Sequence, residues 1–104
     1  MNLRERITIF QYNLTQGDAG EQVETREDIK ETWADVDPMT EKRALEYGQV
    51  LGNRNYFIYL RVESIPNLNN EMLIEWRGRI LTINSVLNFD ARDVYFQVIA
   101  SNND

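Results

Sequence analysis

The carboxylates are the residues of this chain with the most obvious potential for chemistry, because the sequence contains neither histidine nor cysteine. Asp35 and Asp37 flank one residue and could chelate a divalent cation as a pair, but no third ligand follows nearby. The acidic stretch from Gly17 to Glu31 lacks the Asp-x-Asp-x-Asp-Gly spacing with a terminal glutamate that a calcium loop requires. We interpret the pair as a solvated strand end and the stretch as solvated charge.

The sequence favours a protein that is not an enzyme. Without histidine, serine–histidine and cysteine–histidine catalysis are excluded, and the commonest general base is missing. The chain also has no phosphate-binding glycine loop, nucleophile elbow or zinc-ligand spacing. We therefore expect no catalytic residue, no cofactor and no metal ion.

Aromatic and basic residues in the second half of the chain could form a nucleic-acid surface, since bases stack on aromatic rings and arginines bind phosphates. These residues are Tyr56, Phe57, Tyr59, Arg61, Trp76, Arg77 and Arg79. The alternative is that the rings are core or interface and that the arginines pair with glutamates. Seventeen acidic residues against 11 basic ones give a formal charge of -6, which favours the alternative because this field repels DNA.

The length of 104 residues predicts one compact domain, residues 1–104, with one core. With no cysteine, its stability must come from packing. The longest apolar run is far short of the roughly 20 residues that cross a bilayer, and the N-terminus lacks the apolar core of a signal peptide. We expect a soluble protein that is made in the cytoplasm and has no membrane partner.

Apolar periodicity predicts two strands in the first third of the chain. Residues Arg6 to Gln11 alternate at period two, apart from Phe10, and Lys30 to Val36 form a second strand that ends before Pro38. The polar stretch between them, Tyr12 to Ile29, is expected to be a mobile arm or a long hairpin loop.

A short helix is expected next. Thr40 is a suitable N-cap, apolar residues follow at spacings of three and four up to Leu51, and Gly52-Asn53 is a plausible stop. Gly48 inside this segment would cost roughly 1 kcal/mol relative to alanine. We expect the helix to be short or mobile.

The strand predicted at Asn55 to Val62 is apolar on both faces. One face can lie in the core and the other against the helix, and the aromatic face can be an oligomer interface; the two interpretations do not exclude each other. A loop at Glu63 to Glu71 follows. A hairpin at Met72 to Leu87 then turns at Arg77-Gly78, and a last strand spans Asp93 to Ala100.

These elements predict a mainly β fold, a small antiparallel β-barrel or sandwich of about six strands with one short inserted helix. The tail, Ser101 to Asp104, is expected to be frayed.

Three groups of residues carry a family resemblance, and they occur in the same order as in that family. The groups are Arg4, Arg6, Ile7, Thr8 and Ile9; Trp33, Ala34, Asp35, Val36 and Pro38; and Trp76, Arg77, Gly78, Arg79, Ile83 and Val86, followed by Asn88 and Asp90. With them the chain resembles the phage head-tail joining proteins, also called head-closure or stopper proteins. It departs from them at Arg54-Asn55, where many members carry Thr-His.

The resemblance implies a structural virion protein of a tailed phage or prophage. Such proteins assemble from the host cytoplasm into a dodecameric ring below the portal and adaptor, close the DNA channel after packaging and offer a docking surface for the tail. DNA would pass through the channel without sequence-specific binding. Two alternatives remain: a tail-completion protein of similar fold and a small nucleic-acid-binding β-barrel.

Two sets of residues are candidates for that function. Possible subunit or partner contacts are the aromatic residues Trp33, Tyr56, Phe57, Tyr59 and Trp76, each with burial in the core as the alternative. Arg77 and Arg79 are the other candidates, because they could pair with acidic groups of a neighbour. The gate that closes the channel would be either the helical segment, with Gly48 and Gly52 as hinges, or the polar arm, with Gly17 and Gly20.

Overall fold

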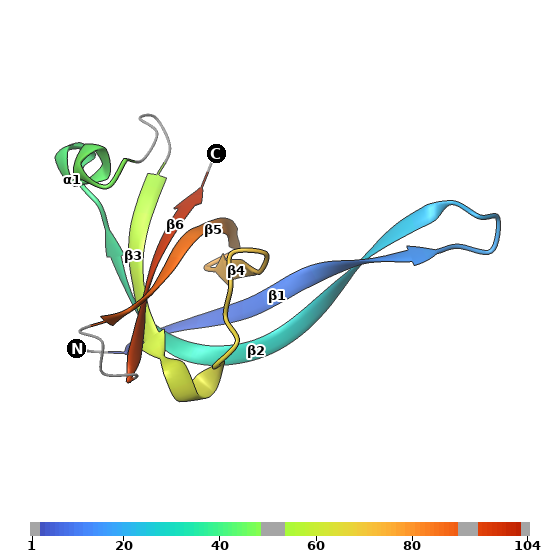
Figure 1. The fold of residues 1–104 in the computed structure, drawn as a ribbon, viewed down its shortest axis with the longest axis horizontal. Coiled ribbons are helices and arrows are strands. Elements are labelled where there is room, and N and C mark those ends of the chain that lie inside the picture. Colours follow the sequence, from blue (N-terminus) through green and yellow to red (C-terminus); the bar gives the residue numbers. More distant parts are fainter. Residues whose placement is uncertain (1–2, 49–53, 90–93, 103–104) are drawn as a thin grey trace.

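The computed structural model describes residues 3–48, 54–89 and 94–102. Within these ranges, six antiparallel strands close into a small barrel in the order β1-β2-β3-β6-β5-β4 (Figure 1). The strands are β1 (Glu5–Gln16), β2 (Gln22–Pro38), β3 (Arg54–Arg61), β4 (Leu73–Trp76), β5 (Arg79–Asn88) and β6 (Tyr95–Asn102). A helix, α1 (Glu41–Glu46), follows β2, and a 3-10 turn, η1 (Val62–Ser64), follows β3. The predicted fold class is confirmed.

The barrel core consists mainly of inward residues at every second strand position, as the period-two pattern predicts. Its fully buried members include Ile9 of β1, Ile58 and Leu60 of β3, Ile74 of β4, Leu81 of β5 and Val98 of β6. Each such side chain contributes roughly 1.5–3 kcal/mol when it leaves water. This core is the main source of stability in a chain without disulfides.

The strand β3 is buried on both faces. Ile58 and Leu60 point into the core, whereas Phe57 is fully buried outside the core cluster. The Phe57 ring lies 5.0 Å from the ring of Tyr47 and 4.5 Å from the guanidinium of Arg43, and both residues belong to the α1 segment. The first interpretation of the two-faced pattern is therefore confirmed: one face packs in the core and the other against the helical segment.

The helix begins as predicted and ends earlier. The Thr40 hydroxyl accepts a hydrogen bond from the backbone N–H of Arg43 at 3.2 Å, which is an N-cap. The last helical residue is Glu46, and Gly48 follows in the left-handed region with φ +71°. The prediction that Gly48 lies inside the helix is wrong, because that conformation is typical of a helix end. The predicted stop at Gly52-Asn53 lies outside the described residues.

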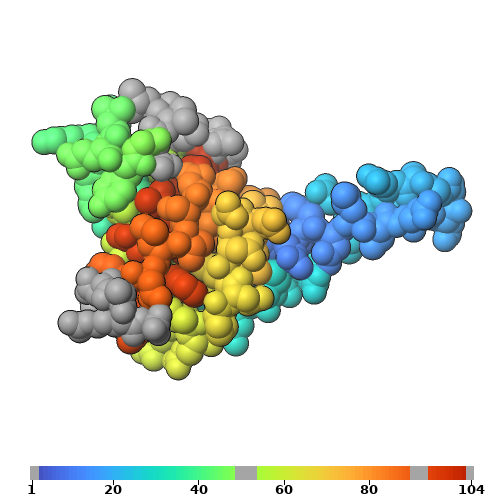
Figure 2. Space-filling view, viewed as in Figure 1, coloured from blue at the N-terminus to red at the C-terminus, as the bar shows by residue number. Residues whose placement is uncertain are grey.

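The polar stretch Tyr12 to Ile29, predicted as a mobile arm or a long hairpin loop, is an arm made of two paired strands. The alternative of a long loop is wrong, and the mobility of the arm stays a prediction. The strands β1 and β2 pair in continuous register from Gln11–Glu27 to Gln16–Gln22. Backbone hydrogen bonds hold such a ladder without any buried side chains, so hydropathy alone does not report it. We call residues 11–28 the arm, and it projects from one side of the barrel (Figures 1 and 2).

Two residues of the tail that was expected to be frayed lie in a strand. Ser101 and Asn102 belong to β6, are buried, and pair with Asn55 and Arg54 of β3. The prediction of a frayed tail is wrong for these two residues, because backbone pairing with β3 continues to Asn102.

Candidate interaction site

The arm leaves two backbone edges unpaired. Among the described residues, β1 pairs with β4 only over Thr8–Phe10, and β2 pairs with β3 only over Asp35–Pro38. Beyond these pairs, β1 and β2 have only each other as neighbouring strands within the described ranges. Unpaired N–H and C=O groups along such an edge can accept a further strand.

The arm is strongly acidic and carries few apolar groups. Residues 11–28 contain five carboxylates and one cation, Arg26, so this short stretch holds most of the net negative charge of the chain. Its large apolar side chains are exposed: Leu14 is 67% accessible, and Tyr12 and Val23 are also exposed. The arm therefore adds almost nothing to the core.

A β-bulge bends the chain where the arm leaves the barrel. The register of β1 and β2 shifts between Ile9 and Phe10, because Ile9 pairs with Lys30 whereas Phe10 pairs with Asp28. The additional residue is Ile29 of β2. A bulge increases the local twist and bends its strand, and Phe10, which breaks the alternation in the sequence, marks its position.

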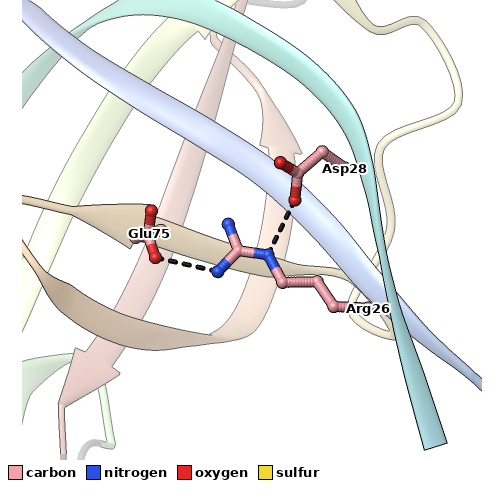
Figure 3. Close-up of polar contacts among 3 residues, drawn as sticks. All are labelled: Arg26, Asp28 and Glu75. Carbon is pink, nitrogen blue, oxygen red and sulfur yellow. Dashed lines mark hydrogen bonds and ion pairs between the residues drawn. The ribbon is translucent and has the colours of Figure 1, made fainter.

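Arg26, the arginine of the arm, holds this bend against the barrel (Figure 3). Its guanidinium donates to a carboxylate oxygen of Asp28 at 2.7 Å and to one of Glu75, on β4, at 2.8 Å. It also lies 4.0 Å from the ring centre of Phe10, which is fully buried. We call Arg26, Asp28, Glu75 and Phe10 the clasp, which joins β2 to β4 across β1.

Charge pairing in the clasp shifts two pKa values. The hydrogen bond from Arg26 lowers the pKa of Glu75, and the bonds to Glu75 and Asp28 raise the pKa of Arg26. Arg26 and Glu75 therefore both remain charged at neutral pH. Sequence analysis missed it, although one arginine among carboxylates next to an interrupted alternation is a local signal for it.

Trp33 is the exposed aromatic residue at the base of the arm. Its side chain is 49% accessible, and the guanidinium of Arg6 lies 4.8 Å from its ring centre. Arg6 also donates to Glu31 at 2.5 Å, so its guanidinium is held between the Trp33 ring and the Glu31 carboxylate. A shallow pocket of about 360 Å³ lies beside it, lined by Leu3, Thr32, Trp33, Arg61 and Ser64.

The other aromatic candidates are less accessible. Tyr56 and Trp76 pack edge to face in the core at 5.3 Å, and the Trp76 indole N–H donates to Glu5 at 2.9 Å. Phe57 is fully buried, and Tyr59 is half-buried with its hydroxyl accepting from Gln97. Tyr56 and Trp76 are buried in the core and Phe57 is buried against the helical segment, so these three rings cannot stack on nucleic-acid bases.

The two arginine candidates flank the turn between β4 and β5. Arg77 and Gly78 both have positive φ, at 50° and 76°, as a two-residue hairpin turn requires. Arg77 pairs with Glu5 at 2.6 Å, and Arg79 lies near the hydroxyl of Tyr56 and over the ring of Trp76. Both arginines thus have contacts within their own chain.

The glycines predicted as hinges lie at two places. Gly17 and Gly20 form the turn at the tip of the arm, where the N–H of Gly17 donates to the carbonyl of Glu21 at 2.7 Å. Gly48 follows α1. Gly52 lies outside the described residues.

Within the described ranges, no three acidic residues gather as a metal site would need. Asp35 and Asp37 lie on β2 beside β3, and Asp37 is 3.9 Å from Arg43. No helix in the same ranges has the length and apolar character needed to cross a bilayer.

Comparison with known proteins identifies the family. A family profile described as phage head completion protein matches residues 1–102. The solution structure of protein SF1141 from Shigella flexneri 2a is 29% identical, with a TM-score of 0.76 over 96% of this chain and 92% of that chain. A chain from the virion of a native gene transfer agent particle shares the fold at 19% identity, with a TM-score of 0.70 over 98% and 96%. No curated protein sequence is significantly similar. Because the profile covers nearly the whole sequence, the chain belongs to the phage head completion protein family.

Proposed function

We propose that this protein forms a ring below the portal and adaptor of a tailed phage, closes the DNA channel after packaging and provides the surface on which the tail docks. Members of its family are structural proteins of the phage head, which act in contact with other virion components. The protein would be made in the host cytoplasm and end in the virion. The observation that carries the proposal is this membership, together with a stable barrel from which an exposed arm projects.

The barrel has the unlike surfaces that a ring subunit needs. Heterologous contacts between copies, and contacts with rings above and below, require different patches on different sides of the molecule. Exposed apolar residues occur at Trp33 of β2 and at Ile80 and Leu87 of β5. These two strands are three positions apart in the closed order of six, so they lie on opposite sides of the barrel.

The charge of the chain suits a protein that surrounds DNA without holding it. A formal charge of -6 disfavours phosphate binding, so a duplex could move past the ring during packaging and ejection. This is the role expected of a channel protein that does not read sequence.

The α1 segment is our candidate for the gate. Of its six helical residues only Ala44 is buried, and a helix of that length is not stable by itself. By contrast, the arm is a continuously paired hairpin held at its base by the clasp. The α1 segment is therefore the easier of the two to displace.

The first test mixes purified protein with filled, tail-less heads of its phage. Electron microscopy of the portal vertex is scored together with DNA retention. A twelve-fold ring under the portal with retained DNA supports the proposal. Binding to isolated tails instead of heads would indicate a tail-completion protein, and salt-dependent binding to free DNA would indicate the nucleic-acid alternative.

A second test addresses the gate. Replacing Glu41–Glu46 with a Gly-Ser linker of equal length should leave the ring assembled and cause filled heads to lose DNA. The same replacement of the Gly17–Glu21 turn tests whether the arm is the gate. Near-ultraviolet circular dichroism checks that the barrel is folded in both variants. If heads with the first variant retain DNA, α1 is not the gate.

A further inference from the structure

We propose that the open edge of β2 over Gln22–Glu31 binds an extended, lysine- and arginine-rich segment of another virion protein, and that the pocket beside Trp33 receives an apolar side chain of that segment. The inference deepens the proposed function by naming the chemistry of a partner, and it rests on that function for the partner's origin in the virion.

The backbone of β2 provides the first argument. Over ten residues, Gln22–Glu31, one edge of β2 pairs with β1, and among the described residues nothing pairs with the other. Every second residue of a strand directs its N–H and C=O toward one edge, so about five residues present unpaired groups here. Pairing with an added strand is a common way to bind an extended peptide.

The charge of the arm provides the second argument. Edge strands without a partner are often protected by lysines. Over Gln22–Glu31, however, four carboxylates outnumber the two cations, Arg26 and Lys30. Asp28 and Glu31 pair with arginines of their own chain, and Arg26 is itself held in the clasp. Among the described residues, Glu24 and Glu27 have no ion pair. Their charge complements a basic segment.

The pocket beside Trp33 provides the third argument. Thr32 and Trp33 continue β2 directly after Glu31, and the pocket that they line with Leu3, Arg61 and Ser64 lies at the barrel end of the open edge. Its volume of about 360 Å³ accommodates one large side chain. Tryptophan and arginine next to such a pocket are the residue types that most often dominate binding energy.

The base of the edge is also held in place before a partner arrives. The bulge at Ile29 sets the direction of the arm, and the clasp and the Arg6–Glu31 pair hold β2 against β1 and β4. A preorganised strand loses less conformational entropy on binding.

A second copy of the chain and a nucleic acid fit this edge poorly. Pairing two arms edge to edge would bring together two segments with five carboxylates each, and opposed like charges destabilise paired strands. A nucleic acid would meet the same negative field.

The test measures hydrogen–deuterium exchange of peptides that cover Gln22–Glu31. It compares isolated protein, protein bound to filled heads of its phage, and complete particles. We expect about five additional slowly exchanging amides in heads or in complete particles, one for each residue that gains a partner strand. If the bound protein shows no added protection in either, the arm is a solvated extension and the inference is wrong.

Variants test the chemistry of the partner. The double variant Glu24→Lys/Glu27→Lys should bind more weakly than the wild type to the heads or particles in which Gln22–Glu31 is protected. Binding of the wild-type protein should fall with rising salt. Trp33→Ala should weaken it by about thirty-fold, the loss typical of an aromatic hot spot. Controls are Glu71→Lys and Val94→Ala, which change exposed residues outside both the arm and α1 and should bind like the wild type.

Each failure has its own signature. If the wild type does not join filled heads, the proposed function fails. If it joins them with the edge protected but the double variant binds equally well, the partner segment is not basic. If protection appears in isolated protein as its concentration rises, the occupant is a second copy. Either of the last two results overturns the inference and leaves the proposed function intact.

Discussion

Arg26 joins segments that are distant in the sequence, because it reaches from the arm across β1 to Glu75 of β4. It combines two charge-assisted hydrogen bonds with contact over the face of Phe10. Planar stacking and forked donation are properties of arginine that lysine does not share. At the scale of single residues, this side chain determines how firmly the arm is attached.

We predict that Arg26→Gln loosens the base of the arm. The loss of both ion pairs and of the cover over Phe10 should speed amide exchange in Thr8–Phe10 and in β4, while the rest of the barrel remains unchanged. Exchange measured by NMR checks this. Arg26→Lys keeps the charge but not the planar contact, so its exchange rates should lie between those of the wild type and Arg26→Gln. Equal rates in all three proteins would contradict the role of the clasp.

The pH dependence of the clasp follows from the lowered pKa of Glu75. A carboxylate whose pKa is lower in the folded state stabilises the fold above its unfolded pKa, about 4.3 for glutamate, and this contribution disappears as the pH falls through the folded value. At neutral pH the wild type should therefore have a larger free energy of unfolding than Glu75→Gln, and this difference should shrink in acid. Urea unfolding of both proteins at neutral and at acidic pH measures the difference. A difference that does not depend on pH would contradict the assignment.

At the scale of elements, turn and cap residues control two local structures. The β4–β5 hairpin depends on Gly78, whose φ of 76° is unfavourable for residues with a Cβ. We predict that Gly78→Ala lowers the free energy of unfolding by about 1–2 kcal/mol. Gly78→Asn should cost less, because asparagine tolerates this conformation. Urea unfolding compares the two, and equal losses would contradict the turn geometry.

The cap of α1 gives a second prediction at this scale. Thr40→Ala should destabilise the helix by about 1 kcal/mol, because the N–H of Arg43 loses its acceptor. Faster amide exchange in Glu41–Glu46 would report the change, and Thr40→Ser should behave like the wild type. Unchanged exchange in Thr40→Ala would show that packing against Phe57, rather than the cap, holds the helix.

The whole molecule consists of a barrel with a core and an arm without one, and its extents of 48 × 32 × 23 Å reflect this shape. We predict that the arm can be shortened without loss of the fold. Asn13 and Thr25 are partners in the ladder, so replacing Leu14–Glu24 with Asn-Gly closes the hairpin in register. The free energy of unfolding should change by less than about 1 kcal/mol, as for exposed surface positions. A larger loss would show that the arm supports the barrel, and small-angle scattering should report a shorter molecule.

The sequence by itself determined the barrel strands, the capped helix and the Arg77-Gly78 hairpin. Alternating apolar residues report which face of a strand is buried, and Thr40 and Gly78 act through contacts a few residues away. The absence of histidine and cysteine was also sufficient to exclude their chemistry. The family resemblance depended on the same local patterns.

Only the tertiary structure decided that the arm is a paired hairpin, that Tyr56 and Trp76 are buried while Trp33 is exposed, and that Arg26 meets Glu75. Backbone pairing of polar strands leaves no hydropathy pattern, and an aromatic ring is buried or exposed according to the distant segments that cover it. The contact between Arg26 and Glu75 joins residues 49 positions apart, which sequence periodicity cannot report because it describes only neighbours along the chain.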